Sequence, residues 1–280
     1  MSRAAHAALP PAPPAVAGAI AALYRGQPVL AAFGLLMWLL MLPAALGLLL
    51  DARTLNESLV WVKPLKFFAS LGLFALTSAW VLGHVAEPAR HGRAARFVVF
   101  VIVAMSTFEA GYIAWQAGHG EASHFNTGDR FHALMYQLMG VGAVMLTATS
   151  GLLAWLVARH AAPGLHPAFR LSIVLGLLLT LALGVATGGF MSAQPGHFAG
   201  TLLPTTTLPL FGWSMTGGDY RVAHFFGMHV QQALPLAGAL IVRLRMPVPR
   251  LAVWTFAAGW CVLVAVTLLQ ARAGQPFFSA

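Results

Sequence analysis

Seven long apolar runs dominate this chain and restrict it to an α-helical membrane protein. They cover residues 28–50, 64–86, 96–118, 131–158, 169–191, 219–244 and 250–271, each bounded by charged residues, Pro or Gly. A helix of about 20 apolar residues spans the hydrocarbon core of a bilayer. A soluble domain has roughly a quarter of its residues charged. Here 59% of the 280 residues are hydrophobic and 8% are charged. The sequence therefore predicts an all-α bundle of seven transmembrane helices over 28–271.

The placement of Lys and Arg predicts how these spans are oriented. Positive charges favour the cytoplasmic side of a bilayer, chiefly in short loops. With the N-terminus inside, ten of the sixteen Lys and Arg residues fall in inner segments. The short connections after the second and sixth runs hold three Arg each. We therefore expect an inner N-terminus and an outer C-terminus. Topology then accounts for the net charge of +9, so nucleic acid is not expected as a partner.

The segments outside the apolar runs differ in character. Residues 1–27 are rich in Ala and Pro and predict a partly disordered tail, with a short interfacial helix over Val16–Tyr24. Residues 192–218 combine Gly and Pro with aromatic residues such as Trp213. This composition favours either a re-entrant or lid-like loop at the outer surface or interfacial anchoring by aromatic side chains. Residues 272–280 form a short C-terminal tail.

Acidic residues gather on the predicted outer side of the bilayer. Only Glu87 of the seven acidic residues lies elsewhere, and the other six are Asp51, Glu57, Glu109, Glu121, Asp129 and Asp219. Ionisable groups in or near lipid are energetically costly, and they commonly mark functional sites. The sequence therefore predicts that the function of the protein lies in the outer half.

Three predicted spans carry a polar face. At about 100° per residue, one arc of the sixth run holds Arg221, His224, Met228, His229, Gln231, Gln232 and Pro235. The opposite, apolar arc is expected to face lipid. A narrower arc of the third run holds Ser106, Glu109, Tyr112, Gln116 and His119. The fourth run begins with His132 and Tyr136, one turn apart. These faces predict a polar interior near the outer surface.

Depth within the bilayer suggests which residues would form the floor of this site. At about 1.5 Å per residue, Glu109 and His229 both lie roughly 13–15 Å from the outer surface, near the midplane. We therefore expect a cleft that opens outward and is floored by these two residues. This prediction requires the third and sixth spans to be neighbours.

Two lysines at the start of the second run depart from the usual charge pattern. Lys63 and Lys66, in WVKPLKFF (61–68), lie at the predicted outer boundary, where two cations oppose the helix dipole. We expect Lys63 to reach the lipid headgroups. We expect Lys66 to have an interior partner, which would be an anionic headgroup, a substrate carboxylate or phosphate, or Glu57.

A metal or haem site is the first functional hypothesis. The candidate ligands are Glu109, His124, His132, His197, His224 and His229, because imidazole and carboxylate suit zinc, iron and copper. His132 or His229 would suit axial ligation of haem. In an enzyme, Glu109, His224 and His229 would be metal ligands or acid/base groups. No C-x-x-C-H, H-E-x-x-H or histidine-box motif is present, so the sequence signal for a metal is diffuse. Whether the protein is an enzyme stays open. The predicted ligand-binding residues around them are Lys66, Tyr112, Gln116, Tyr136, Trp213, Arg221 and Gln232.

Two other classes of function would use the same polar residues. A transporter, sensor or proton-handling protein would bind a small or amphipathic ligand from the outer side. The inner halves of the first, fifth and seventh spans are apolar, which disfavours a through-pathway. A membrane subunit of a larger complex would bury its polar face against a partner. A retinal protein needs a Lys in the last span, and residues 250–271 contain none.

Several motifs resemble those of a set of bacterial membrane proteins. They are KPLKF (63–67), SHFN (123–126), GHFAG (196–200) and GDYRVAHFFGMH (218–229). They resemble polytopic, seven-span proteins with no assigned activity, over residues from about 60 to 240. The resemblance implies a multi-pass protein of a bacterial inner membrane and supplies no reaction.

Overall fold

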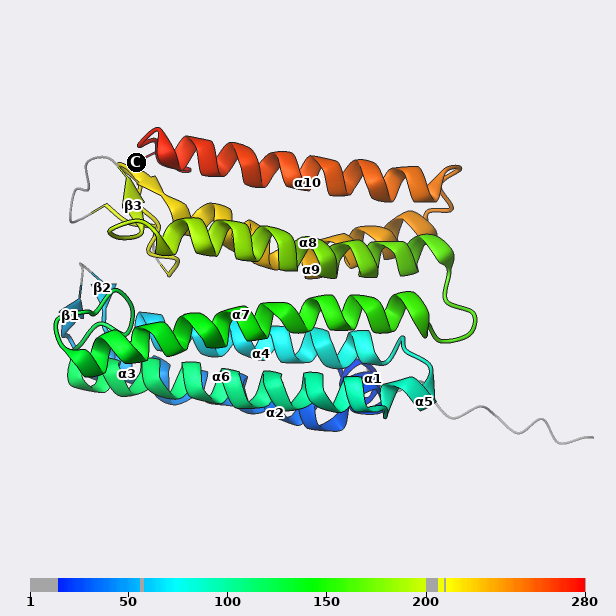
Figure 1. Cartoon of the computed structure of the whole chain (residues 1–280), viewed down its shortest axis with the longest axis horizontal. Coiled ribbons are helices and arrows are strands. Elements are labelled where there is room, and N and C mark those ends of the chain that lie inside the picture. The colour runs from blue at the N-terminus through cyan, green and yellow to red at the C-terminus, as the bar shows by residue number, and fades with distance from the viewer. Residues whose placement is uncertain (1–14, 56–57, 200–205, 209, 280) are drawn as a thin grey trace, which may run out of the picture.

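Long, nearly parallel helices make up the structure, a computed structural model that describes residues 15–55, 58–199, 206–208 and 210–279 (Figure 1). Within these residues, seven helical segments are long and apolar enough to cross a membrane. The first consists of α2 (Pro28–Leu39) and α3 (Met41–Leu50), and the others are α4 (Val62–Leu82), α6 (Arg93–His119), α7 (Arg130–Arg159), α8 (Pro167–Ser192), α9 (Tyr220–Arg243) and α10 (Pro249–Arg272). The predicted all-α, seven-helix bundle of a multi-pass membrane protein is confirmed.

Short elements lie at the two ends of the bundle. The predicted helix over Val16–Tyr24 is present as α1 (Ala15–Gly26), and the 14 residues before it lie outside the described residues. The one-turn helix α5 (Glu87–Arg90) follows α4. Two antiparallel pairs of strands join β1 (Thr54–Leu55) to β2 (Ser58–Leu59) and β3 (Phe198–Ala199) to β4 (Gly218–Asp219).

The two ends are named here from the predicted topology. The outer end carries β1 to β4 and the C-terminus, on the left in Figure 1, and the inner end carries α1 and α5, on the right. The orientation of these ends across the membrane stays a prediction.

The helices form two packed groups that meet along α7 and α8. α4 packs against α1, α2, α3, α6 and α7, whereas α9 packs between α8 and α10 (Figure 1). Buried apolar side chains such as Leu30, Leu82, Ile102 and Leu153 fill the interior of the first group.

The apolar arc of the sixth span does not face lipid, so that prediction is wrong. Ala223, Val230 and Leu234 are each 0% exposed. Val230 and Leu234 pack with Ala257 of α10 and with partly buried residues of α8. Two neighbouring helices therefore cover this arc. A membrane-spanning helix can bury an apolar face against protein as readily as against lipid, and sequence periodicity does not distinguish the two. Apolar residues exposed on this side of the bundle include Leu251 and Val262 of α10 and Leu236 of α9, which lies outside the predicted apolar arc.

Candidate functional site

A segment before α9 folds back over the outer end of the bundle. We call residues 206–219 the outer segment, and residue 209 within it lies outside the described residues. Backbone hydrogen bonds close it on itself, from Leu208 N to Trp213 O at 2.7 Å and from Met215 N to Thr206 O at 3.0 Å. The buried Asp219 accepts a further hydrogen bond from Ser214 N at 3.0 Å. These contacts give the outer segment a defined conformation.

Aromatic side chains fix the outer segment to the helices beneath it. The Trp213 side chain is buried, and its ring centroid lies 4.7 Å from that of Phe211 and 5.4 Å from that of Phe225 on α9. Phe277, after α10, contacts Trp213 from another side at 6.2 Å. The part of the predicted 192–218 loop that is described therefore packs on the bundle, and residues 200–205 lie outside the described residues.

Two cations from different spans meet at the backbone of the outer segment. Lys66 Nζ donates to Phe211 O at 2.9 Å, and Arg221 donates to Gly212 O. A Cβ atom on Gly212 would lie 3.6 Å from Lys66 Nζ and 3.9 Å from Arg221 Nη1. The partner of Lys66 is thus a backbone carbonyl, Phe211 O, where sequence analysis expected an anion. Glu57, one of the expected partners, lies outside the described residues.

Asp219 neutralises Arg221 in a buried pair. Its side chain is 0% exposed, and its two oxygens accept from Arg221 Nε at 2.9 Å and Nη2 at 2.6 Å. The Arg221 guanidinium also lies over the ring of Phe198 at 4.7 Å from the centroid. A charge-assisted, two-point contact of this kind fixes the arginine in one orientation. It thereby ties the start of α9 to β3.

A third cation, Lys63, lies among the histidines of the outer end. Lys63 Nζ is 3.0 Å from His124 Nδ1, so the expectation that Lys63 reaches the headgroups is wrong. Burial, followed by the charges of Lys63 and His197, holds the pKa of His124 well below its usual range. The imidazole of His124 is therefore neutral at neutral pH, and its Nδ1, which also lies 3.2 Å from Ser123 Oγ, can accept from the lysine ammonium.

The positive charges of Lys63, Lys66 and Arg221 all act on the imidazole of His197. Burial and then the positive charge of Arg221 and Lys63 lower its pKa to about 4, with Lys66 adding to the effect and Asp219 opposing it. Its ring packs edge-on against Phe125 at a centroid distance of 4.9 Å. We call Lys63, Lys66 and Arg221 the outer cationic group.

Polar atoms without partners follow one face of α6 below this group. Ser106 Oγ, Glu109 Oε1 and Tyr112 Oη are buried and lack a hydrogen-bond partner among the described residues. A Cβ atom on Gly142 of α7 would lie 3.1 Å from Glu109 Oε1, so this face of α6 meets α7. Buried polar groups are normally hydrogen-bonded. This face therefore offers hydrogen-bonding capacity that the residues described by the structure do not use.

The predicted floor of Glu109 and His229 is not assembled as expected. α6 packs mainly on α4 and α7, whereas α9 packs on α8 and α10, so the two spans are not principal neighbours. His229 Nδ1 lies 3.3 Å from Gln232 Oε1, and Gln232 Nε2 donates to Thr77 Oγ1 of α4 at 3.1 Å. Matching depth in the bilayer therefore did not bring Glu109 and His229 into contact.

The remaining predicted histidines have protein partners. His224 Nδ1 lies 3.0 Å from Thr187 Oγ1 on α8. His132 contacts a carboxylate through each ring nitrogen, with Nε2 at 3.0 Å from Glu121 and Nδ1 at hydrogen-bond distance from Asp129. Asp129 is also the N-cap of α7, and it accepts from the backbone N–H groups of residues 131 and 132. His132 would have to give up one of these contacts to bind a metal.

Other predicted ligand-binding residues lie at the outer end but have structural contacts there. Gln116 donates to Ala122 O at 3.1 Å and holds the connection after α6. Tyr136 packs against Phe125 and His124, with ring centroids at 5.3 Å and 6.0 Å.

Side chains suited to metal ligation are not grouped in the part of the chain that the structure describes. No three His, Cys, Asp or Glu residues lie close enough there to hold one ion. The arrangement of the described donor side chains therefore does not support the predicted transition-metal or haem site.

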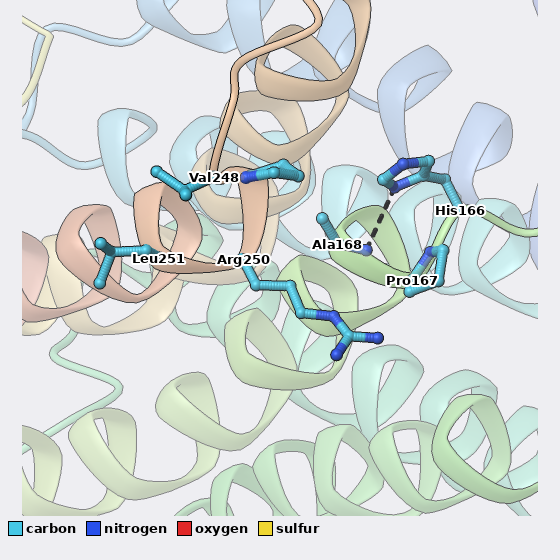
Figure 2. Close-up of a pocket in the computed structure, with 7 residues that line it drawn as sticks. His166, Pro167, Ala168, Val248, Arg250 and Leu251 are labelled. Carbon is cyan, nitrogen blue, oxygen red and sulfur yellow. Dashed lines mark hydrogen bonds between the residues drawn. The ribbon is translucent and has the colours of Figure 1, made fainter.

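A pocket of about 440 Å³ lies at the inner end between the starts of α8 and α10 (Figure 2). Its lining is mostly apolar and includes Val248, Leu251 and one cation, Arg250. His166 accepts a hydrogen bond from Ala168 N at 3.2 Å. His166, one of the polar residues of this pocket, thus caps the start of α8.

Sequence analysis missed the convergence of the outer cationic group. The D-x-R spacing of Asp219 and Arg221 at the start of a span was a readable signal, because both side chains leave the same helix end. The carbonyl partner of Lys66, Phe211 O, left no such signal. No protein-family model, no curated protein and no solved structure matches this chain.

Proposed function

We propose that this protein binds an anionic ligand at the outer cationic group, acting as a transporter or sensor. Neither Lys63 nor Lys66 has a carboxylate within 4.0 Å among the described residues, whereas Arg221 is paired with Asp219. This surplus of positive charge in a half-buried site carries the proposal. A desolvated ammonium is stabilised by an opposite charge, which a carboxylate or phosphate would supply.

The surroundings favour an amphipathic anion. Phe211, Trp213 and Phe225 form an apolar cluster beside the cations that contact the outer segment. Below them, the unpartnered oxygens of Glu109 and Tyr112 would accept or donate further hydrogen bonds. Pockets that combine apolar walls with a few polar groups orient small molecules in this way.

The test uses isothermal titration calorimetry on the purified full-length protein. Octanoate and octyl phosphate are the anionic probes, and octyltrimethylammonium is the cationic control. Each anion should bind, and Lys66→Gln should weaken binding about 10- to 150-fold, since a hydrogen bond to a charged group contributes about 1.5–3 kcal/mol. Arg130→Gln is the matched control, because Arg130 is an exposed cation at the same end. Equal affinities for the two variants, or binding of the cation alone, would overturn the proposal.

We further propose a bacterial inner membrane as the location, with the outer end in the periplasm. The distribution of Arg over the short connections supports this orientation. A reporter fused at Gly120 should then be periplasmic and one at Gly164 cytoplasmic. The opposite pair of results would refute the orientation.

A further inference from the structure

A second cationic site lies at the inner end, far from the outer cationic group. It is a pocket of about 490 Å³ between α1, the C-terminal end of α4 and α5. Arg25, His84 and Arg90 line it together with Trp80 and the backbone of Gly26 and Gly83. No carboxylate is among its lining residues.

The two arginines of this pocket lack charge partners among the described residues. Neither Arg25 nor Arg90 has a carboxylate within 4.0 Å in the described part of the chain. Arg90 Nε is buried and has no hydrogen-bond partner there. Glu87, the acidic residue of this end, is exposed and makes no ion pair with them. An unpaired guanidinium retains donors in a fixed fork that matches the oxygens of a phosphate.

Close backbone packing makes the pocket a formed site. A Cβ atom on Gly26 would lie 2.2 Å from Ala79 O, so α1 rests directly on the backbone of α4. His84 Nδ1 lies 2.9 Å from Trp80 O, which fixes the imidazole ring. The chain after α4 is also held to the connection between α7 and α8, through Ala86 N to His160 O at 2.7 Å. The walls are therefore set by contacts that do not depend on a ligand.

We propose that this pocket binds a phosphate group through Arg25 and Arg90. The phosphate belongs either to an anionic phospholipid headgroup or to a water-soluble phosphate ester, and the recognition chemistry is the same in both. The exposed apolar residues of α1, Val16 and Ile20, lie on the element that forms one wall. Basic residues at the cytoplasmic end of a membrane protein attract anionic lipid, which is the first of these sources.

Native mass spectrometry of the full-length protein in neutral detergent tests the proposal. The probes are dioleoyl phosphatidylglycerol, dioleoyl phosphatidylcholine with the same acyl chains, and glycerol 3-phosphate. The double variant Arg25→Gln/Arg90→Gln should weaken phosphatidylglycerol binding by about tenfold or more and leave phosphatidylcholine unchanged. Glycerol 3-phosphate binding that is lost in the same variant would instead identify a soluble ester as the ligand.

The matched control is Arg93→Gln/Arg96→Gln, which removes the same charge from exposed positions at the same end. Equal losses in the two double variants would show general surface electrostatics and overturn the proposal. The proposal would also be overturned if the unmodified protein did not prefer phosphatidylglycerol to phosphatidylcholine and did not bind glycerol 3-phosphate. Arg25→Gln alone changes an exposed side chain, so it preserves the test if the double variant does not fold.

Discussion

Acidification should open the outer segment through protonation of His197. The pKa of this histidine is lowered from 6.5 to about 4 in the closed structure, first by burial and then by the nearby cations. In a locally opened state the imidazole is solvated, so its pKa returns to the usual value. The closed state is then favoured by a neutral His197 above about pH 6.5, and this stabilisation is lost as the pH falls toward 4.

The pKa difference sets the size of the effect. A shift in pKa from 6.5 to about 4 corresponds to about 3 kcal/mol of stabilisation of the closed state. When the pH lies below both values, the opening equilibrium constant is therefore about 300-fold larger than above both values. At pH 5 most opened molecules carry the proton and most closed molecules do not. The opening constant should then be about 30-fold larger than at pH 8. These values are upper limits, because His197 is only partly shielded from solvent.

Hydrogen exchange measured by mass spectrometry would detect this opening. Tyr220 N donates to His197 O at 3.0 Å, so its amide reports separation of β3 from β4. After correction for the intrinsic pH dependence of amide exchange, peptides over 206–221 should lose protection between pH 8 and 5. His197→Gln should flatten that dependence, while His91→Gln, an exposed change at the inner end, should not. An unchanged pH dependence in His197→Gln would refute the reasoning.

Two further substitutions test the packing around the outer segment. Gly218→Ala would place a Cβ atom 1.9 Å from a backbone carbonyl of α10, so it should destabilise the protein by about 1–3 kcal/mol in a thermal unfolding assay. In the control Gly196→Ala, the new Cβ atom meets nothing within 4 Å, so this variant should be as stable as the unmodified protein. Asp219→Asn leaves Arg221 without its buried partner and should cost about 3–5 kcal/mol, seen as a lower Tm and faster proteolysis within 206–219. Asp51→Asn breaks a more exposed ion pair and should cost no more than about 1 kcal/mol. Equal costs for the two Asp variants would contradict the conclusion that burial of the Asp219–Arg221 pair makes it important for stability.

Hydropathy was sufficient to predict the spans but not their local breaks. The expected runs agree with the helices to within a few residues, because the length of an apolar run follows from the thickness of a bilayer. The second span ends at Leu82, earlier than the predicted 86, because the chain turns at Gly83 toward α5. The break between α2 and α3 at Leu40 was not predicted, since its residues are as apolar as those around it.

The candidate site was harder to predict because it depends on which helices are neighbours. The inward polar face of the sixth span was recognisable, and Gln232 does reach Thr77 of α4. The prediction that Glu109 and His229 lie together rested only on their equal depth in the bilayer, but their helices pack mainly on other helices. Lys66 finds its partner in a backbone carbonyl of a segment far along the chain. Every residue has a backbone carbonyl, so no sequence pattern predicts this contact.

The contact between Lys66 and Phe211 also constrains how the protein is synthesised. The two residues are 145 positions apart, so α4 enters the membrane long before its outer lysine has this partner. The nascent protein must carry Lys66 at a bilayer surface while three more spans, α6, α7 and α8, are made, and only the segment before α9 then supplies its partner. Closure of this end is therefore a late step of biogenesis. A chain that stops before residue 206 would insert α4 but leave Lys66 available to other anions or to quality-control machinery.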